Sequence, residues 1–146
     1  MLKLTKKADY GLIAMRHLAQ HAEVGPSSAK DLAGLYGMPR EALAKILQGL
    51  TRAGLLVSQH GINGGYSLAR DPRRISAFEV IQAIEGPLFI TSCSTTTDDC
   101  DQSSRCTVRE PLRKVSRSIE DVLSHLTIWD LTQPEYAASS ELVRLI

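Results

Sequence analysis

The sequence contains no long uninterrupted apolar run. Its uncharged apolar stretches fall far short of the roughly 18 residues that a membrane-spanning helix needs, and this excludes a membrane protein built from such helices. The basic start of the chain is not followed by an apolar signal core, because Arg16 and His17 interrupt the one apolar segment near it. We therefore expect a cytoplasmic protein without an export signal.

Cysteine is scarce, with only three residues in 146. An odd number of cysteines in a chain expected to stay in the cytoplasm argues against a structural disulfide framework. The sequence also has no nucleophile motif, no set of residues typical of a substrate pocket and, apart from one glycine-rich turn, no phosphate-binding loop. These absences argue against an enzyme. With 43% apolar and 23% charged residues, the composition is that of an ordinary globular protein.

The net charge of +1 conceals an uneven distribution. Residues 1–75 hold eleven Lys and Arg against five Asp and Glu, whereas residues 76–110 hold two against six and residues 111–146 four against five. A basic first half suggests an anionic partner for that half.

The first half also has the pattern of a winged helix-turn-helix. Apolar spacing predicts helices over 6–22, 29–35, 39–53 and 76–85, and a short turn with Gly37 joins the second to the third. Strands at 55–59 and 66–69 flank a turn rich in glycine, which predicts a β-hairpin, the wing. The expected fold is therefore mainly α with a small β-hairpin wing.

A winged helix-turn-helix binds DNA through the second helix of its motif, whose early side chains reach base edges. Here Arg40 or Lys45 can donate to guanine and Gln48 can read adenine. Other cations, including the Arg70, Arg73 and Arg74 group, can hold phosphates. The residues that we predict to contact DNA are Lys3, Thr5, Lys6, Lys7, Ser28, Pro39, Arg40, Glu41, Lys45, Gln48, Arg52, His60, Gly61, Gly64 and Gly65.

Residues 111–127 form a further predicted helix with one apolar stripe. We expect the stripe to pair with a second copy of the chain, because palindromic operators are read by two-fold dimers; the alternative is that this helix folds back on its own winged helix. The predicted units are a DNA-binding domain (1–86), a cysteine-bearing loop (87–110) and a dimerisation helix with a C-terminal tail (111–146).

The cysteines of that loop, Cys93, Cys100 and Cys106, are separated by six and five residues. Neither gap fits the two to four residues usual between zinc-ligating cysteines. Within the loop, residues 91–108 are mainly Ser, Thr and Asp with almost nothing apolar, so a metal centre is the expected source of their order. Thiolates favour iron–sulfur clusters, zinc or Cu(I). We favour a cluster over free thiols and zinc.

Several of these features together resemble the IscR/NsrR family of winged-helix iron–sulfur repressors. They are Leu4-Thr5-Lys6 with Tyr10, the wing from His60 to Leu68, the stretch from Ile75 to Ile84, and the three cysteines. The resemblance covers about residues 1–130 and is greatest to regulators of iron–sulfur cluster assembly, SUF-type operons especially. It implies a homodimeric DNA-binding repressor with an iron–sulfur cluster, for which we favour 2Fe-2S over 4Fe-4S.

The sequence departs from the family pattern at the expected fourth cluster ligand. Assembly regulators have a histidine where this chain has Arg109, which cannot ligate. Members that sense nitric oxide use an acidic residue near the N-terminus, and Asp9 matches that position. We therefore predict that Asp9 of one subunit completes the ligand set of the other; the alternative is that Asp9 only stabilises the start of its helix. His60 also stands where the family has arginine.

The resemblance implies that the state of the cluster sets DNA affinity. An ordered loop is expected to set the distance between two DNA-binding domains, which must match half-sites about 34 Å apart. Two alternatives stay open. One is a nitric oxide or redox sensor of the same fold, and the other is a thiol-switch repressor without metal.

Overall fold

The computed structural model describes residues 3–88 and 107–134 of the chain. The first three helices are α1 (Lys6–Gln20), α2 (Ala29–Tyr36) and α3 (Arg40–Arg52). They are followed by the strands β1 (Leu56–Gln59) and β2 (Gly65–Leu68), the short helix η1 (Pro72–Arg74) and α4 (Ala77–Glu85). The last two helices are α5 (Arg109–His125) and α6 (Ile128–Thr132).

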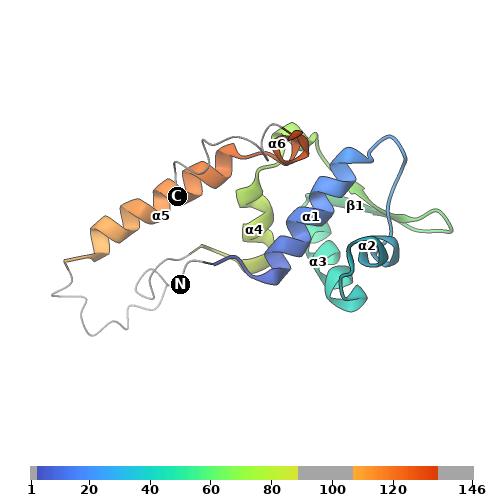
Figure 1. The fold of residues 1–146 in the computed structure, drawn as a ribbon, viewed down its shortest axis with the longest axis horizontal. Coiled ribbons are helices and arrows are strands. Elements are labelled where there is room, and N and C mark those ends of the chain that lie inside the picture. The colour runs from blue at the N-terminus through green and yellow to red at the C-terminus, as the bar shows by residue number, and fades with distance from the viewer. Residues whose placement is uncertain (1–2, 89–106, 135–146) are drawn as a thin grey trace.

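Figure 1 shows two parts. We call the unit formed by α1 to α4, the hairpin and α6 the head, and α5 extends away from it. The mainly α fold with a β-hairpin wing is confirmed. The helix ends lie within two residues of those predicted, and Pro39 lies just before α3 as its N-cap residue.

The wing is fastened to the rest of the head. β1 and β2 pair antiparallel, with Leu56 opposite Leu68. On the other side of β2, Ser27 and Tyr66 exchange two backbone hydrogen bonds of 3.1 and 2.8 Å. The turn before α2 therefore forms an isolated bridge with β2 that holds the hairpin in place.

The apolar residues of the head form one core. In α3, Leu43, Ile46, Leu47 and Leu50 recur at steps of three, one and three, so they share one buried face. They meet buried side chains of α1, α2, α4 and β1, and Ile128 of α6 completes the cluster.

Two elements, η1 and α6, were not predicted from the sequence. Both are too short to show a helical period, yet α6 packs on α1 and on η1. Ile128 is 0% exposed, and its N–H donates to the Ile75 carbonyl over 2.8 Å. The Ala77 N–H donates to the Leu126 carbonyl over 2.7 Å, so the chain after α5 is joined to the start of α4. The three-unit division at 86 and 110 stays a prediction, but α6 belongs structurally to the head.

α5 has a strongly one-sided distribution of apolar residues, of which the head covers only part. It packs on α4, and Ser116 is its only buried residue. Val115 and Val122, both on the predicted stripe, are 46% and 43% exposed. The packing of α5 on the head, which was the alternative to dimerisation, therefore leaves Val115 and Val122 of the stripe open to solvent. No helix among the described residues is both long and apolar enough to cross a membrane.

His17 occupies a buried position on α1, consistent with packing rather than ligation. Its Nδ1 shares a 2.8 Å hydrogen bond with the Tyr36 hydroxyl, and its ring stacks on His21 with centroids 4.1 Å apart. Burial, with a smaller contribution from the charge on His21, lowers the pKa of His17 below its ordinary 6.5.

The lowered pKa predicts a pH-dependent stability. Because the unfolded chain binds this proton more tightly, we expect stability to be full above about pH 6.5 and to fall as the pH drops below it. Urea unfolding across this pH range measures the effect, and His17→Gln should flatten the curve. The matched variant His125→Gln, at an exposed position, should leave it unchanged; equal curves for wild type and His17→Gln would contradict the prediction.

Candidate nucleic-acid interface

The exposed side of α3 carries every polar residue predicted there to contact DNA. Because the apolar residues of α3 face the core, the remaining positions of each turn point to solvent. The exposed residues are Arg40, Glu41, Lys45, Gln48 and Arg52. This face can offer four hydrogen-bonding or cationic side chains, with one carboxylate, to a single anionic surface.

A groove beside α3 brings the start of the chain to this face. It encloses about 560 Å³, and Lys7, Lys45 and Arg52 lie around it with Glu41. Its apolar lining comes from α3 and from the end of α4, where Ala83 and Ile84 lie. Residues far apart in the sequence, in the first turn of α1 and along α3, are therefore combined into one largely cationic surface.

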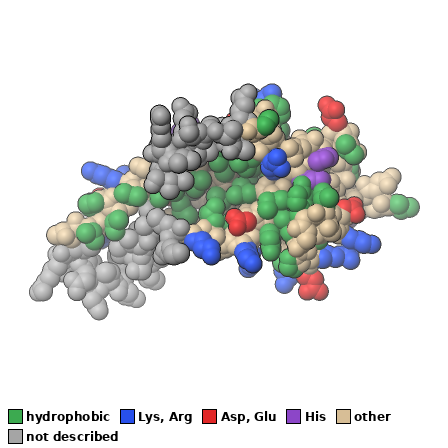
Figure 2. All heavy atoms as spheres, viewed as in Figure 1, with side chains coloured by type: hydrophobic (Ala, Val, Ile, Leu, Met, Phe, Trp, Pro, Cys, Tyr) green, Lys and Arg blue, Asp and Glu red, His purple; other side chains and the backbone are tan. Residues whose placement is uncertain are grey.

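We call residues 3–7 the lysine arm. Lys3, Lys6 and Lys7 are all exposed. Figure 2 shows that Lys and Arg side chains gather along the lower edge of the head, around α3 and the start of α1, with some Asp and Glu side chains between them. Such a surface attracts the phosphates of a nucleic acid.

Two of the predicted contact residues already have hydrogen-bonding roles inside the protein. Thr5 is the N-cap of α1: its hydroxyl oxygen accepts from Ala8 N at 3.3 Å, and its backbone N–H donates to Glu85 Oε1 over 3.1 Å. The Thr5 hydroxyl also donates to Glu85 Oε1. Ser28 caps α2 by accepting from Asp31 N at 3.1 Å. A phosphate can accept a hydrogen bond from the Thr5 hydroxyl only if it displaces the Glu85 carboxylate.

The wing glycines make room for the protein's own backbone. A Cβ on Gly64 would lie 2.4 Å from the Gln59 carbonyl oxygen, and one on Gly65 would lie 2.5 Å from the Ser27 carbonyl. Contact of these two glycines with DNA stays a prediction. His60 and Gly61 are exposed at the wing turn, and Ile62 beside them is fully exposed.

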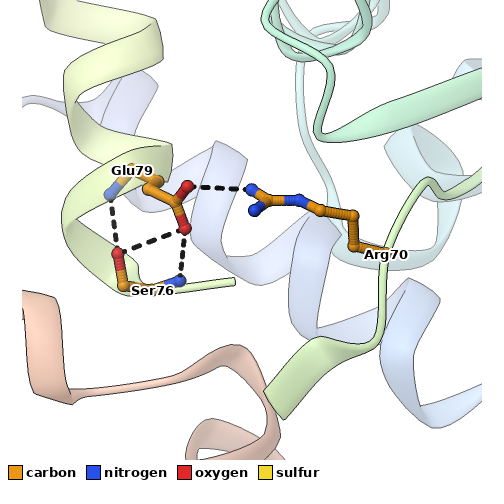
Figure 3. Close-up of polar contacts among 3 residues, drawn as sticks. All are labelled: Arg70, Ser76 and Glu79. Carbon is orange, nitrogen blue, oxygen red and sulfur yellow. Dashed lines mark hydrogen bonds and ion pairs between the residues drawn. The ribbon is translucent and has the colours of Figure 1, made fainter. Parts of the chain in front are cut away.

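Two of the three arginines after the wing, Arg70 and Arg73, are engaged within the head. Arg70 donates to Glu79 Oε1 over 2.8 Å, and Glu79 also accepts from Ser76 N at 3.0 Å, which completes a capping box on α4 (Figure 3). Burial alone raises the pKa of Glu79, but the hydrogen bonds from Arg70 and Ser76 outweigh it and leave the pKa lowered. Arg73 lies over the Trp129 ring, 4.4 Å from its centre. These contacts compete with the predicted binding of phosphates.

The predicted cluster ligands divide between two regions. Cys93, Cys100 and Cys106 lie outside the described residues. Asp9 is described, and its exposed side chain lies in the first turn of α1. Within residues 3–88 and 107–134, no three His, Cys, Asp or Glu side chains are grouped closely enough to hold a metal ion.

Sequence reasoning missed two acidic residues of this region. Glu79 had a local signal, because Ser76 and Glu79 have the spacing of a capping box. Glu85 had none, because its partner Thr5 is 80 positions away.

The chain is similar to known transcriptional regulators. Residues 4–134 match the family model of Rrf2, described as an iron-dependent transcriptional regulator. The regulator IscR of Vibrio campbellii is 32% identical over 130 residues, which cover 89% of this chain and 77% of that protein.

Solved structures agree with this. IscR of T. potens is 34% identical with a TM-score of 0.74, over 94% of this chain and 91% of that one. CymR of B. subtilis, a global cysteine regulator, is 30% identical with a TM-score of 0.73, over 90% of this chain and 97% of that one. These relatives are named as regulators, which agrees with a function other than catalysis.

Proposed function

Because the chain belongs to the Rrf2 family of transcriptional regulators, we propose that it is a dimeric repressor whose affinity for operator DNA is set by an iron–sulfur cluster. The proposed targets are genes of iron–sulfur cluster assembly. One observation carries the proposal: a cationic recognition-helix face and a segment with three cysteines occur in one short chain.

The DNA-binding part of the proposal is supported by the groove beside α3. Lys45 and Arg40 are the proposed donors to guanine and Gln48 the proposed reader of adenine, because all three are exposed on the side of α3 that faces away from the core. Lys7 and Arg52 lie at the edges of the same groove and are proposed to hold phosphates.

The residues present suit an iron–sulfur cluster. Cys93, Cys100 and Cys106 supply three soft thiolates, and Asp9 of the second chain is the proposed fourth ligand. Asp9 is exposed, and its helix is capped by Thr5, which is hydrogen-bonded to the last residue of α4. The cysteine-bearing segment begins shortly after that residue in the sequence. When bound, the cluster supplies sensitivity to oxidants, nitric oxide and iron supply.

Dimerisation through α5 is supported by its exposed stripe. Val115 and Val122 remain nearly half exposed on the apolar side of α5, and a second copy of α5 can cover them. Since α6 joins α5 to the head through backbone hydrogen bonds, such a pairing fixes the separation of the two α3 helices.

The first test is the cofactor content of protein purified without oxygen. We expect visible absorption with iron and acid-labile sulfide, all lost in Cys106→Ala because three thiolates are needed. The iron count per chain separates 2Fe-2S from 4Fe-4S. Asp9→Ala should change the spectrum and shorten the lifetime of the cluster in air, whereas the neighbouring control Lys6→Ala should not. An unchanged Asp9→Ala spectrum would remove Asp9 from the ligand set.

The second part of the test is binding to a duplex enriched from a random DNA pool by the cluster-loaded protein. At one fixed salt concentration, loaded and cluster-free protein should differ in affinity by about 5- to 150-fold. Equal affinities would refute control by the cluster.

The similarity to CymR favours one second candidate, a thiol-switch repressor without metal. In that case the protein stays colourless after attempted cluster reconstitution, and oxidation forms a reversible disulfide that changes DNA affinity.

A further inference from the structure

The carboxylate of Glu85 joins two distant parts of the head. Glu85 is the last residue of α4, and one of its oxygens receives both the Thr5 backbone N–H, over 3.1 Å, and the Thr5 hydroxyl proton. Thr5 precedes it by 80 positions and stands at the start of α1. A single acceptor atom therefore connects the end of α4 to the lysine arm.

The same contact fixes the direction of the lysine arm. The Thr5 hydroxyl donates a hydrogen bond to Glu85, and its oxygen accepts one from Ala8 N at 3.3 Å. The Thr5 carbonyl accepts from Asp9 N at 3.1 Å. Thr5 is thus held on both sides, by α4 and by the first turn of α1. The arm carries Lys3, Lys6 and Lys7, and Lys7 borders the groove beside α3.

From electrostatics alone, the negative charge of Glu85 is unfavourable for phosphate binding at the lysine arm. A carboxylate beside the arm repels the phosphates that its lysines are proposed to bind. Among the described residues, no Lys or Arg lies within ion-pair distance of Glu85 to offset it. Within the described part, the side-chain hydrogen bonds of Glu85 are those to Thr5.

We infer that Glu85 is a positioning residue for DNA binding: it holds the lysine arm beside α3 so that phosphate contacts of the arm and of α3 form together. The inference rests on the DNA contacts of the proposed function. It goes beyond them by assigning a role in anion binding to an anionic residue.

Two substitutions separate the hydrogen-bond acceptor from the charge. Glu85→Gln removes the charge but keeps an acceptor oxygen, whereas Glu85→Ala removes both. If Glu85 acts only through its charge, both variants bind DNA equally and more tightly than wild type. If it positions the arm, Glu85→Ala binds more weakly than wild type and than Glu85→Gln.

The measurement is the salt dependence of binding to a labelled duplex of fixed random sequence, since phosphate contacts do not depend on sequence. Each lost phosphate contact should reduce the slope of log affinity against log salt by about 0.9 and, at about 0.15 M salt, cost roughly fivefold in affinity. Glu23→Ala is the matched control, because it removes an equal charge from an exposed position past the far end of α1. It should keep the wild-type slope.

The outcomes separate the inference from its premise. A wild-type slope near zero would overturn the proposed DNA face, and the inference with it. A steep wild-type slope that Glu85→Ala retains would overturn the inference alone. Thermal unfolding and the iron content of each variant, expected to match wild type because Glu85 is exposed, exclude a general loss of structure as the cause of weaker binding.

Discussion

Replacing Gly65 by alanine is expected to destabilise the head by about 3–5 kcal/mol and to release the wing. Gly65 has a φ of +153°, which L side chains rarely adopt, and the added Cβ would lie 2.5 Å from both the carbonyl carbon and oxygen of Ser27. The obstacle is backbone, so no side chain can rotate away. The Ser27–Tyr66 hydrogen bonds must therefore break, and they are what fastens β2 to the turn before α2.

Gly54→Ala is the matched control for this prediction. Gly54 also has a positive φ, +80°, but its added Cβ has no atom within 4 Å. It should therefore show the conformational penalty alone, about 1–2 kcal/mol. Urea unfolding gives both values, and equal destabilisation by the two substitutions would show that the contact with Ser27 does not matter.

Ile128→Ala is expected to destabilise the head by about 2–5 kcal/mol, the usual cost of truncating a fully buried isoleucine. Ile128 is 0% exposed and belongs to the same core cluster as Leu43 and Ile75. Its loss opens a cavity between α6, α1 and η1. Because native domains are stable by about 5–15 kcal/mol in total, this one change in a five-residue helix should lower the unfolding midpoint strongly.

The control is the same substitution at Ile62, which is fully exposed at the wing turn. Ile62→Ala should change stability by less than about 0.5 kcal/mol. A small effect of Ile128→Ala in the same urea experiment would mean that α6 is not an integral part of the head.

The fold could be predicted from the sequence wherever a local period is long enough. Leu43, Ile46, Leu47 and Leu50 repeat over several turns, so α3 and its buried face follow directly from the pattern. α6 spans fewer than two turns and shows no period, although Thr127 and Asp130 have the spacing of a capping box and form one. The spacing of Thr127 and Asp130 is the local sequence signal that could have revealed α6.

The candidate site was only partly predictable for a different reason. The exposed residues of α3 follow from the position of its apolar face, so their common orientation needs no tertiary information. Thr5 is hydrogen-bonded to Glu85 and Arg70 to Glu79. No local sequence pattern predicts either of these contacts, and only the folded chain reveals them. Residue type alone does not separate a threonine that caps a helix from one that binds phosphate, since both tasks use the hydroxyl.

The backbone junction between Ala77 and Leu126, with Ile128 behind it, has a consequence during synthesis. The ribosome makes α1 to α4 and the wing first, but the core cluster lacks its last member until α6 has emerged. A nascent chain therefore carries the complete α5 before it carries a complete DNA-binding unit. Partial chains that end before α6 therefore lack a complete DNA-binding unit. Such incomplete translation products should compete poorly for the operator.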